Sequence, residues 1–226
     1  MASFLEFIRM HIFHIAPILI AGFVGVAIIV ERMHVLVWVY PMHRSNAFFE
    51  KIRDLIMADR IGEAIVFCDK YRLKPVAQVV KEGLMRAHQP ETLIEHGLEI
   101  AASEQSQKVM LRTSFLATIA NVSTLLGLFG TILGLIQSFD AVGAASAQQR
   151  SALLASGIST AMNATMLGLA VAIPCMVAFS FLMNRANRLN ADLERSAVKV
   201  LDLLKQRYFG VNNLPSGELS SVSKAI

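Results

Sequence analysis

The sequence has little charge and almost no cysteine. Of its 226 residues, 17% are charged and two are cysteines, whereas soluble domains carry about 25% charged residues. Cys68 stands among charged neighbours and Cys175 in an apolar run, which argues against a disulfide framework or a thiolate metal cluster. The hydrophobic share of 54% and the mean hydropathy of +0.52 predict an integral membrane protein.

Two long runs lack any charged residue, from Thr113 to Phe139 and from Ser151 to Asn184. Each is longer than the roughly 20 apolar residues with which a helix crosses a bilayer. Residues 140–150 between them are too few for a domain. The sequence therefore predicts two antiparallel transmembrane helices, 113–139 and 151–184, joined by a short loop at 140–150.

A further membrane span is expected near the start of the chain. Residues 1–9 are expected to form a segment on the outer side of the membrane, and residues 10–40 the first transmembrane helix with its end at the membrane interface. The opening residues lack the basic cluster and cleavage site of a cleaved signal, so we expect a retained anchor. His11 and His14 could share a metal on a helix, but no third ligand is near, and we expect no metal site.

Residues 41–112 mix charged and apolar residues at three- and four-residue spacing, which is typical of amphipathic helices. Pro75 and Pro90 are expected helix starts, and Asp59–Gly62 an expected helix junction. This pattern predicts a helical cytoplasmic region of several short helices followed by a long one.

The amphipathic pattern of charged and apolar residues continues after the last apolar run. Residues 185–210 extend the third helix into water, with Gly210 as the expected stop, and 211–226 form an expected disordered tail. The predicted fold is all-α: an integral membrane protein with three transmembrane helices, the second and third extended into the cytoplasm, plus a helical cytoplasmic region.

The distribution of lysine and arginine along the chain predicts which side of the membrane each segment faces. Twelve lie between Arg32 and Arg112 and seven from Arg185 onward, which leaves Arg9 and Arg150 for the other side. Excess positive charge is typical of the cytoplasmic side. We therefore expect an outer N-terminus and a cytoplasmic C-terminus.

Hydroxyl groups recur in the two uncharged runs. Thr124, Thr131 and Ser138 stand seven residues apart and share a helix face. Small residues, which let helices approach closely in lipid, flank these faces: Gly127, Gly130 and Gly134 in one run, and Ala161, Gly168 and Ala172 beside Thr165 in the other. Thr160 belongs to a second polar surface with Ser156, Ser159 and Asn163, and Pro174 interrupts the helix ladder.

Alternatively, these hydroxyls have only a structural role within their own helices. Serine and threonine in membrane helices often donate a hydrogen bond to the backbone carbonyl one turn earlier. Two neighbouring helices that pair hydroxyls with small residues favour a hydrated or partner-lined pathway. Neither run contains Asp, Glu, His, Lys or Arg, and membrane proton relays normally use such groups. Another chain must then supply the titratable group.

Other functions find little support. The glycines of the second span lack the Lys-Ser/Thr of a phosphate loop, no H-E-x-x-H occurs, and Ser156 and Ser159 have no base in their span. We expect no enzyme, no cofactor and no nucleic-acid partner. Glu31 and Arg32 end the first span and are expected to be interfacial anchors, and Asp140 a solvated loop charge.

The segments LGLFGTILG (126–134) and AMNATMLGLAVAIP (161–174) resemble the double signature of the MotA/TolQ/ExbB proton-channel family, in particular its TolQ/ExbB branch. The resemblance is specific over about 113–189. It implies an inner-membrane stator in which a homopentamer surrounds a dimer of a single-span, ExbD/TolR-like partner that carries a membrane Asp. The family's pathway threonines correspond to Thr131 and Thr165.

One position departs from the family. TolQ and ExbB usually have a glutamate in a G-I-x-E-A-L pattern, whereas this chain has Thr160 there. The transported ion is therefore either the proton or sodium, and the proton is favoured. A passive membrane scaffold is the alternative function. The expected partners also include the lipid bilayer and a further envelope protein. The sequence leaves open which envelope machine is driven.

Overall fold

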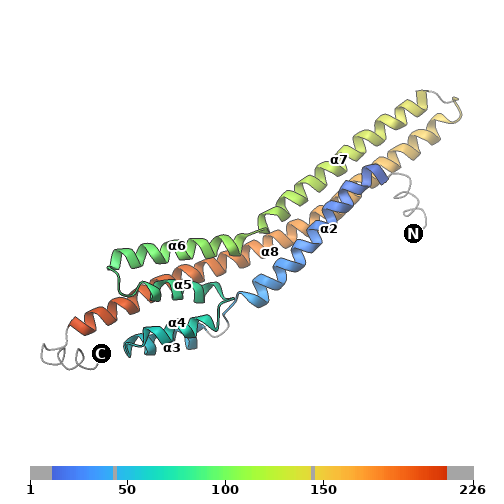
Figure 1. The fold of residues 1–226 in the computed structure, drawn as a ribbon. Coiled ribbons are helices and arrows are strands. Elements are labelled where there is room, and N and C mark those ends of the chain that lie inside the picture. Colours follow the sequence, from blue (N-terminus) through green and yellow to red (C-terminus); the bar gives the residue numbers. More distant parts are fainter. Residues whose placement is uncertain (1–11, 43–44, 144–145, 213–226) are drawn as a thin grey trace. The chain divides into compact units, whose positions relative to one another are not determined.

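The computed structural model describes residues 12–42, 45–143 and 146–212. The expected outer segment 1–9 and most of the expected tail, residues 213–226, lie outside the described residues. All regular elements in the described ranges are helices (Figure 1). The chain divides into two compact units, which we call the apolar unit (up to His34, with Arg112–Asn184) and the polar unit (Val35–Leu111, with Arg185 onward).

Three helices form the apolar unit: α2 (Ile12–His34), α7 (Thr113–Gly143) and the first part of α8 (Arg150–Asn212). Three helical stretches, Ala16–Val39, Glu91–Gly143 and Arg150–Tyr208, are long and apolar enough to cross a membrane. The prediction of an all-α protein with three membrane-spanning helices is therefore confirmed.

Small side chains let these three helices meet. Ala120 of α7 packs with Ala172 and Cys175 of α8 in a buried cluster, against which the larger Ile29, Ile119 and Val171 pack. A Cβ atom added to Gly25 of α2 would lie 2.7 Å from the Cys175 sulfur. Because lipid is as apolar as these side chains, close van der Waals packing rather than the hydrophobic effect holds such helices together.

The helix ends differ from the expected boundaries by a few residues. Helix α7 continues to Gly143, past residue 140, where the sequence predicts the start of the loop. Helix α8 runs unbroken through Pro174, and the structure describes it as far as Asn212, past the expected stop at Gly210.

The polar unit contains η1 (Val35–Val39, a π-helix), α3 (Ser45–Met57), α4 (Ile61–Asp69), α5 (Pro75–Met85), α6 (Glu91–Met110) and the end of α8. Pro75 begins α5, and Pro90 directly precedes α6, as the sequence predicts. The junction of α3 and α4 contains Asp59 with a positive φ of 57°. Short helices followed by a long one thus make up this region.

Buried apolar side chains and peripheral ion pairs hold the polar unit together. Ile52, Val79, Leu84 and Leu193 are among the fully buried side chains. Lys205 of α8 pairs with Glu91 of α6 at 2.7 Å, and Arg207 pairs with Asp59 at 2.5 Å. Burial raises the pKa of the Cys68 thiol to about 12, so this cysteine is an unreactive core residue.

Candidate functional site

Helices α7 and α8 make their closest approach at glycines. We call the contact of Gly127, Gly130 and Gly134 with α8 the α7–α8 seam. A Cβ atom on Gly127 would lie 3.2 Å from the Cα of Gly168, and one on Gly168 would lie 2.6 Å from the Ser123 carbonyl oxygen. Both neighbours are backbone atoms, which cannot move aside as a flexible side chain can. Larger residues at these positions would separate the helices.

The contacts along the seam define its direction. A Cβ on Gly130 would lie 2.7 Å from the Cβ of Ala164, and one on Gly134 would lie 2.9 Å from the Cβ of Ala161. As residue numbers rise along α7 they fall along α8, so the two helices are antiparallel. Further along, a Cβ on Gly157 would overlap the Ser138 hydroxyl.

Thr165 and Thr131 meet at one carbonyl group of the seam. The Thr165 hydroxyl donates to the Gly127 carbonyl oxygen across the helix pair, at 3.2 Å. Gly127 precedes Thr131 by four residues, so the same carbonyl accepts the Thr131 amide hydrogen in the α-helical ladder. Thr165 thus contacts this carbonyl through its hydroxyl, and Thr131 through its backbone amide.

The other candidate hydroxyls donate within their own helices. Thr124 donates to the Ala120 carbonyl at 3.0 Å, Thr131 to the Leu128 carbonyl at 2.6 Å, and Thr160 to the Ser156 carbonyl at 3.0 Å. Thr160 precedes Thr165 by five residues, about 140° around the helix at 3.6 residues per turn. Thr160 therefore does not share the face of α8 that carries Thr165.

Pro174 lies on α8, and Ser123 lies on α7 close to the seam. Pro174 is exposed on α8, and the helix continues past it. Ser123 is fully buried, and its hydroxyl oxygen has no hydrogen-bond partner in the described part of the chain. Ser123 is not among the residues that the sequence singles out. Its position four residues before Gly127, on the face that contains the glycines, is the signal that would have found it.

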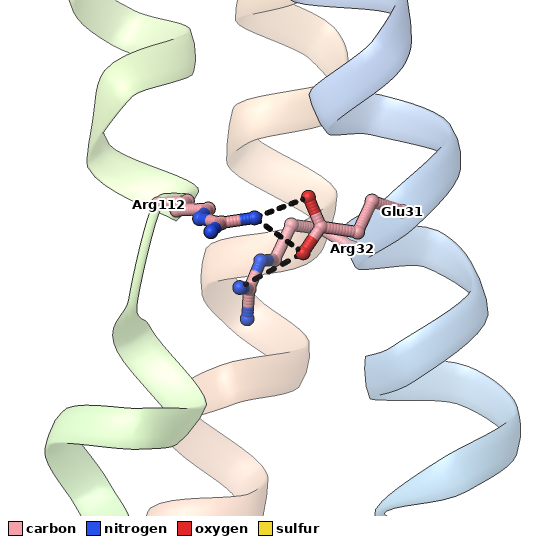
Figure 2. A network of polar contacts seen from close by, with 3 residues as sticks. All are labelled: Glu31, Arg32 and Arg112. Atoms are coloured by element: carbon pink, nitrogen blue, oxygen red, sulfur yellow. Dashed lines mark hydrogen bonds and ion pairs between the residues drawn. The ribbon is translucent and has the colours of Figure 1, made fainter.

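Charged side chains of the apolar unit gather at the end of α2. The Glu31 carboxylate accepts two hydrogen bonds of 2.9 Å from Arg112, which precedes α7, and one of 3.3 Å from Arg32 (Figure 2). The Arg32 side chain is 5% exposed, whereas those of Arg112 and Glu31 are 54% and 41% exposed. This network ties α2 to α7 and does more than anchor a helix end in the interface.

The seam itself carries no titratable group. The uncharged runs of the sequence cover both of its sides. Among the described residues, no group of three His, Cys, Asp or Glu side chains is placed to hold a metal ion. His11 and the side chain of His14 lie outside the described residues. Within the described part, the seam offers hydroxyl oxygens, a carbonyl and close helix packing.

Comparison with known proteins gives a consistent family assignment. Residues 72–195 match the model of the MotA/TolQ/ExbB proton channel family. The Tol-Pal system protein TolQ of Haemophilus influenzae is 31% identical over 157 residues, which cover 66% of this chain and 64% of that protein. A putative biopolymer transport protein, ExbB-like 3 of Synechocystis, is 31% identical over 71% of this chain and 76% of its own.

The biopolymer transport protein ExbB of Salmonella typhimurium is 37% identical over 105 residues, 46% of this chain and 42% of that protein. The match thus spans less than two thirds of the TolQ and Salmonella ExbB relatives. With three apolar helices, the chain groups with multi-pass inner-membrane proteins.

Proposed function

Since the chain belongs to the MotA/TolQ/ExbB proton channel family, we propose that it is the pentamer-forming stator subunit of an inner-membrane motor that converts proton-motive force into work on envelope machinery. Its partner is a single-span protein similar to ExbD or TolR, with an aspartate in its membrane helix. The relatives named for the Tol-Pal system and for biopolymer transport support this role.

The observation that carries the proposal is the hydrogen bond from the Thr165 hydroxyl to the Gly127 carbonyl, between two runs without charged residues, 113–139 and 151–184. A pathway needs polar groups at the depth of the membrane, and the hydroxyls of Thr165 and Thr131 supply them here. An ionisable group is also required. The partner's aspartate supplies it, so the helix pair is one wall of a pathway that a second chain completes.

Orientation and domain roles belong to the same proposal. The N-terminus is periplasmic and the C-terminus cytoplasmic, so the polar unit lies in the cytoplasm, where the lysine and arginine residues gather. The connection between Gly143 and Arg150 is the periplasmic turn. Thr160 stands where relatives in the TolQ/ExbB branch have a glutamate. Protons are the transported ion, and sodium is the alternative that flux measurements would identify.

The test removes the two threonine hydroxyls without changing side-chain size. Thr131→Val and Thr165→Val are combined in the complex purified with its partner, and proton flux into vesicles is followed with a pH-sensitive dye. We expect flux to fall at least tenfold. Thr118→Val is the matched control, because Thr118 precedes Gly127 by nine residues, on the opposite side of α7.

Unchanged flux in the double variant, with normal assembly, would remove the two threonines from the pathway. One observation favours the alternative of a passive scaffold: Thr124, Thr131 and Thr160 all donate to their own helices, as purely structural hydroxyls do. A scaffold predicts no proton flux through the wild-type complex. The wild-type measurement alone therefore separates the two functions.

A further inference from the structure

A lysine from a distant loop binds the end of the first membrane span. The helical stretch Ala16–Val39 is long and apolar enough to cross a membrane, and η1 is its last part. The Lys74 ammonium donates to the carbonyl oxygens of Val39 and Pro41, at 2.5 and 2.9 Å. A helix end leaves its last carbonyls without partners inside the helix. These two bonds therefore hold residue 74 at the membrane end of the span.

Lys74 is the last residue of the connection between α4 and α5. We call residues 70–74 the α4–α5 loop. The Lys74 amide donates to the Tyr71 carbonyl at 2.8 Å, and the Arg72 carbonyl accepts from the Gln78 side chain at 2.8 Å. Because these backbone groups are already paired within the protein, the loop presents its side chains from a fixed backbone. Such a surface loses little conformational entropy when it binds.

Apolar and basic side chains stand next to each other in this loop. Leu73 is 66% exposed and Tyr71 is 39% exposed. Lys70 and Arg72 are exposed as well, and neither side chain has an ion-pair partner among the described residues. The adjacent carboxylate, that of Asp69, pairs with another lysine at 2.6 Å. The loop thus combines exposed apolar groups with positive charge that no neighbouring carboxylate balances.

The end of the span also carries an exposed aromatic ring. Trp38, next to Val39, is 75% exposed. Tryptophan and tyrosine are enriched where a membrane meets water, because their rings suit the headgroup level. Lysine and arginine near an anionic lipid surface strengthen binding by about fivefold per residue. A single exposed leucine needs no explanation, but apolar, aromatic and basic side chains beside the end of a span fit a lipid surface.

We propose that the α4–α5 loop is a second membrane contact of the polar unit. Leu73 and Tyr71 enter the headgroup region of the leaflet at that end of the first span, and Lys70 and Arg72 bind anionic phospholipid headgroups there. In the orientation proposed above, this is the cytoplasmic leaflet. The contact goes beyond the proposed function, because it does not depend on ion conduction and would serve a passive scaffold equally.

A tryptophan placed in the loop tests this contact in the full-length protein, reconstituted into vesicles. The chain has one tryptophan, Trp38, so Trp38→Phe gives a silent background that keeps an aromatic ring. Leu73→Trp is then compared with Val198→Trp, which is also an exposed position of the polar unit. Val198 lies 14 residues beyond Asn184, about 21 Å along α8. The vesicles contain phosphatidylglycerol or phosphatidylcholine with brominated acyl chains, which quench tryptophan on contact.

We expect brominated phosphatidylglycerol to quench the emission of Leu73→Trp by about half, because the loop lies in the headgroup region. Quenching by brominated phosphatidylcholine at the same mole fraction should be weaker by about twofold or more. Emission from Val198→Trp should change little with either lipid. Quenching of Leu73→Trp that does not exceed that of Val198→Trp would overturn the membrane contact. Equal quenching by the two lipids would overturn the recognition of anionic headgroups.

A second measurement needs no change of tryptophan. Lys70→Gln combined with Arg72→Gln should lower the number of phosphatidylglycerol molecules that native mass spectrometry finds on the protein. Arg195→Gln combined with Lys199→Gln removes the same charge from α8, more than about 15 Å beyond Asn184, where the lipid surface is screened. This control should retain lipid as wild type does. Equal retention by both double variants would contradict the proposal. Neither experiment measures flux, so their outcome is independent of the proposed function.

Discussion

At the scale of single residues, the informative group is the one around Glu31. One carboxylate serves two guanidinium groups, the exposed one of Arg112 and the buried one of Arg32. The Nε atom of Arg32 is buried without a partner in the described part of the chain. A buried charge that loses its partner is costly, while an exposed ion pair contributes little. The two arginines therefore depend on Glu31 to different degrees.

We predict unequal effects of two neutralising substitutions. Glu31→Gln leaves Arg32 buried without a carboxylate and should lower the free energy of unfolding by about 3 kcal/mol. Arg112→Gln removes only an exposed pair and should cost less than about 1 kcal/mol. Denaturant unfolding of the detergent-solubilised protein measures both. Glu63→Gln, in an exposed pair with Arg60, is the control. Equal losses for Glu31→Gln and Arg112→Gln would contradict this interpretation.

At the scale of elements, the contact of α7 with α8 depends on backbone proximity. The Ser123 carbonyl and the Cα of Gly127 lie where a side chain on Gly168 would go, at 2.6 and 2.9 Å from its Cβ. The bond from Thr165 to Gly127 is available only while the helices are this close. The packing of Gly127 against Gly168 and the placement of the Thr165 hydroxyl therefore depend on the same distance between the two helices.

Two glycine-to-alanine substitutions distinguish the effect of this helix contact on stability from the effect of helix propensity. Gly168→Ala forces α7 and α8 apart and should lower stability by about 1 to 3 kcal/mol. It should also reduce proton flux, because Thr165 loses its position. Gly143→Ala, at the end of α7, meets nothing within 4 Å and should be neutral or stabilising by up to about 1 kcal/mol. Thermal unfolding in detergent provides the comparison. Tolerance of Gly168→Ala would show that the helices are not held at this distance.

At the scale of the whole molecule, the apolar unit has more apolar surface than its own helices cover. On α7 alone, Leu125, Phe129 and Phe139 are each more than half exposed. Such surface belongs against lipid or other subunits. The proposed pentamer with an enclosed partner would cover one side of α7, and lipid the other.

The copy number is directly measurable. We predict that native mass spectrometry of the complex, released gently from the membrane, finds five copies of the 24.8-kDa chain together with a shorter single-span protein. The assembly should persist in Thr131→Val, because that substitution leaves the glycine contacts intact. A single copy without partner would contradict both the pentamer and the shared pathway.

Much of the architecture could be predicted from the sequence. The uncharged runs indicated membrane helices because no charged side chain interrupts them, and Pro75 and Pro90 indicated helix starts because proline suits a first turn. The unbroken course of α8 past Pro174 was not predicted, because a proline removes one backbone hydrogen bond and packing against neighbouring helices decides whether the helix continues.

The sequence by itself determined that this protein spans the membrane with α-helices and that the runs 113–139 and 151–184 lack any charged residue, because both follow from residue types along the chain. Only the tertiary structure decided which hydroxyl crosses between helices, since Thr165 could equally have donated to its own helix, as Thr131 does. It also decided that Glu31 pairs with Arg112, which lies 81 residues away. Such contacts depend on the register of packed helices, which periodicity alone does not specify.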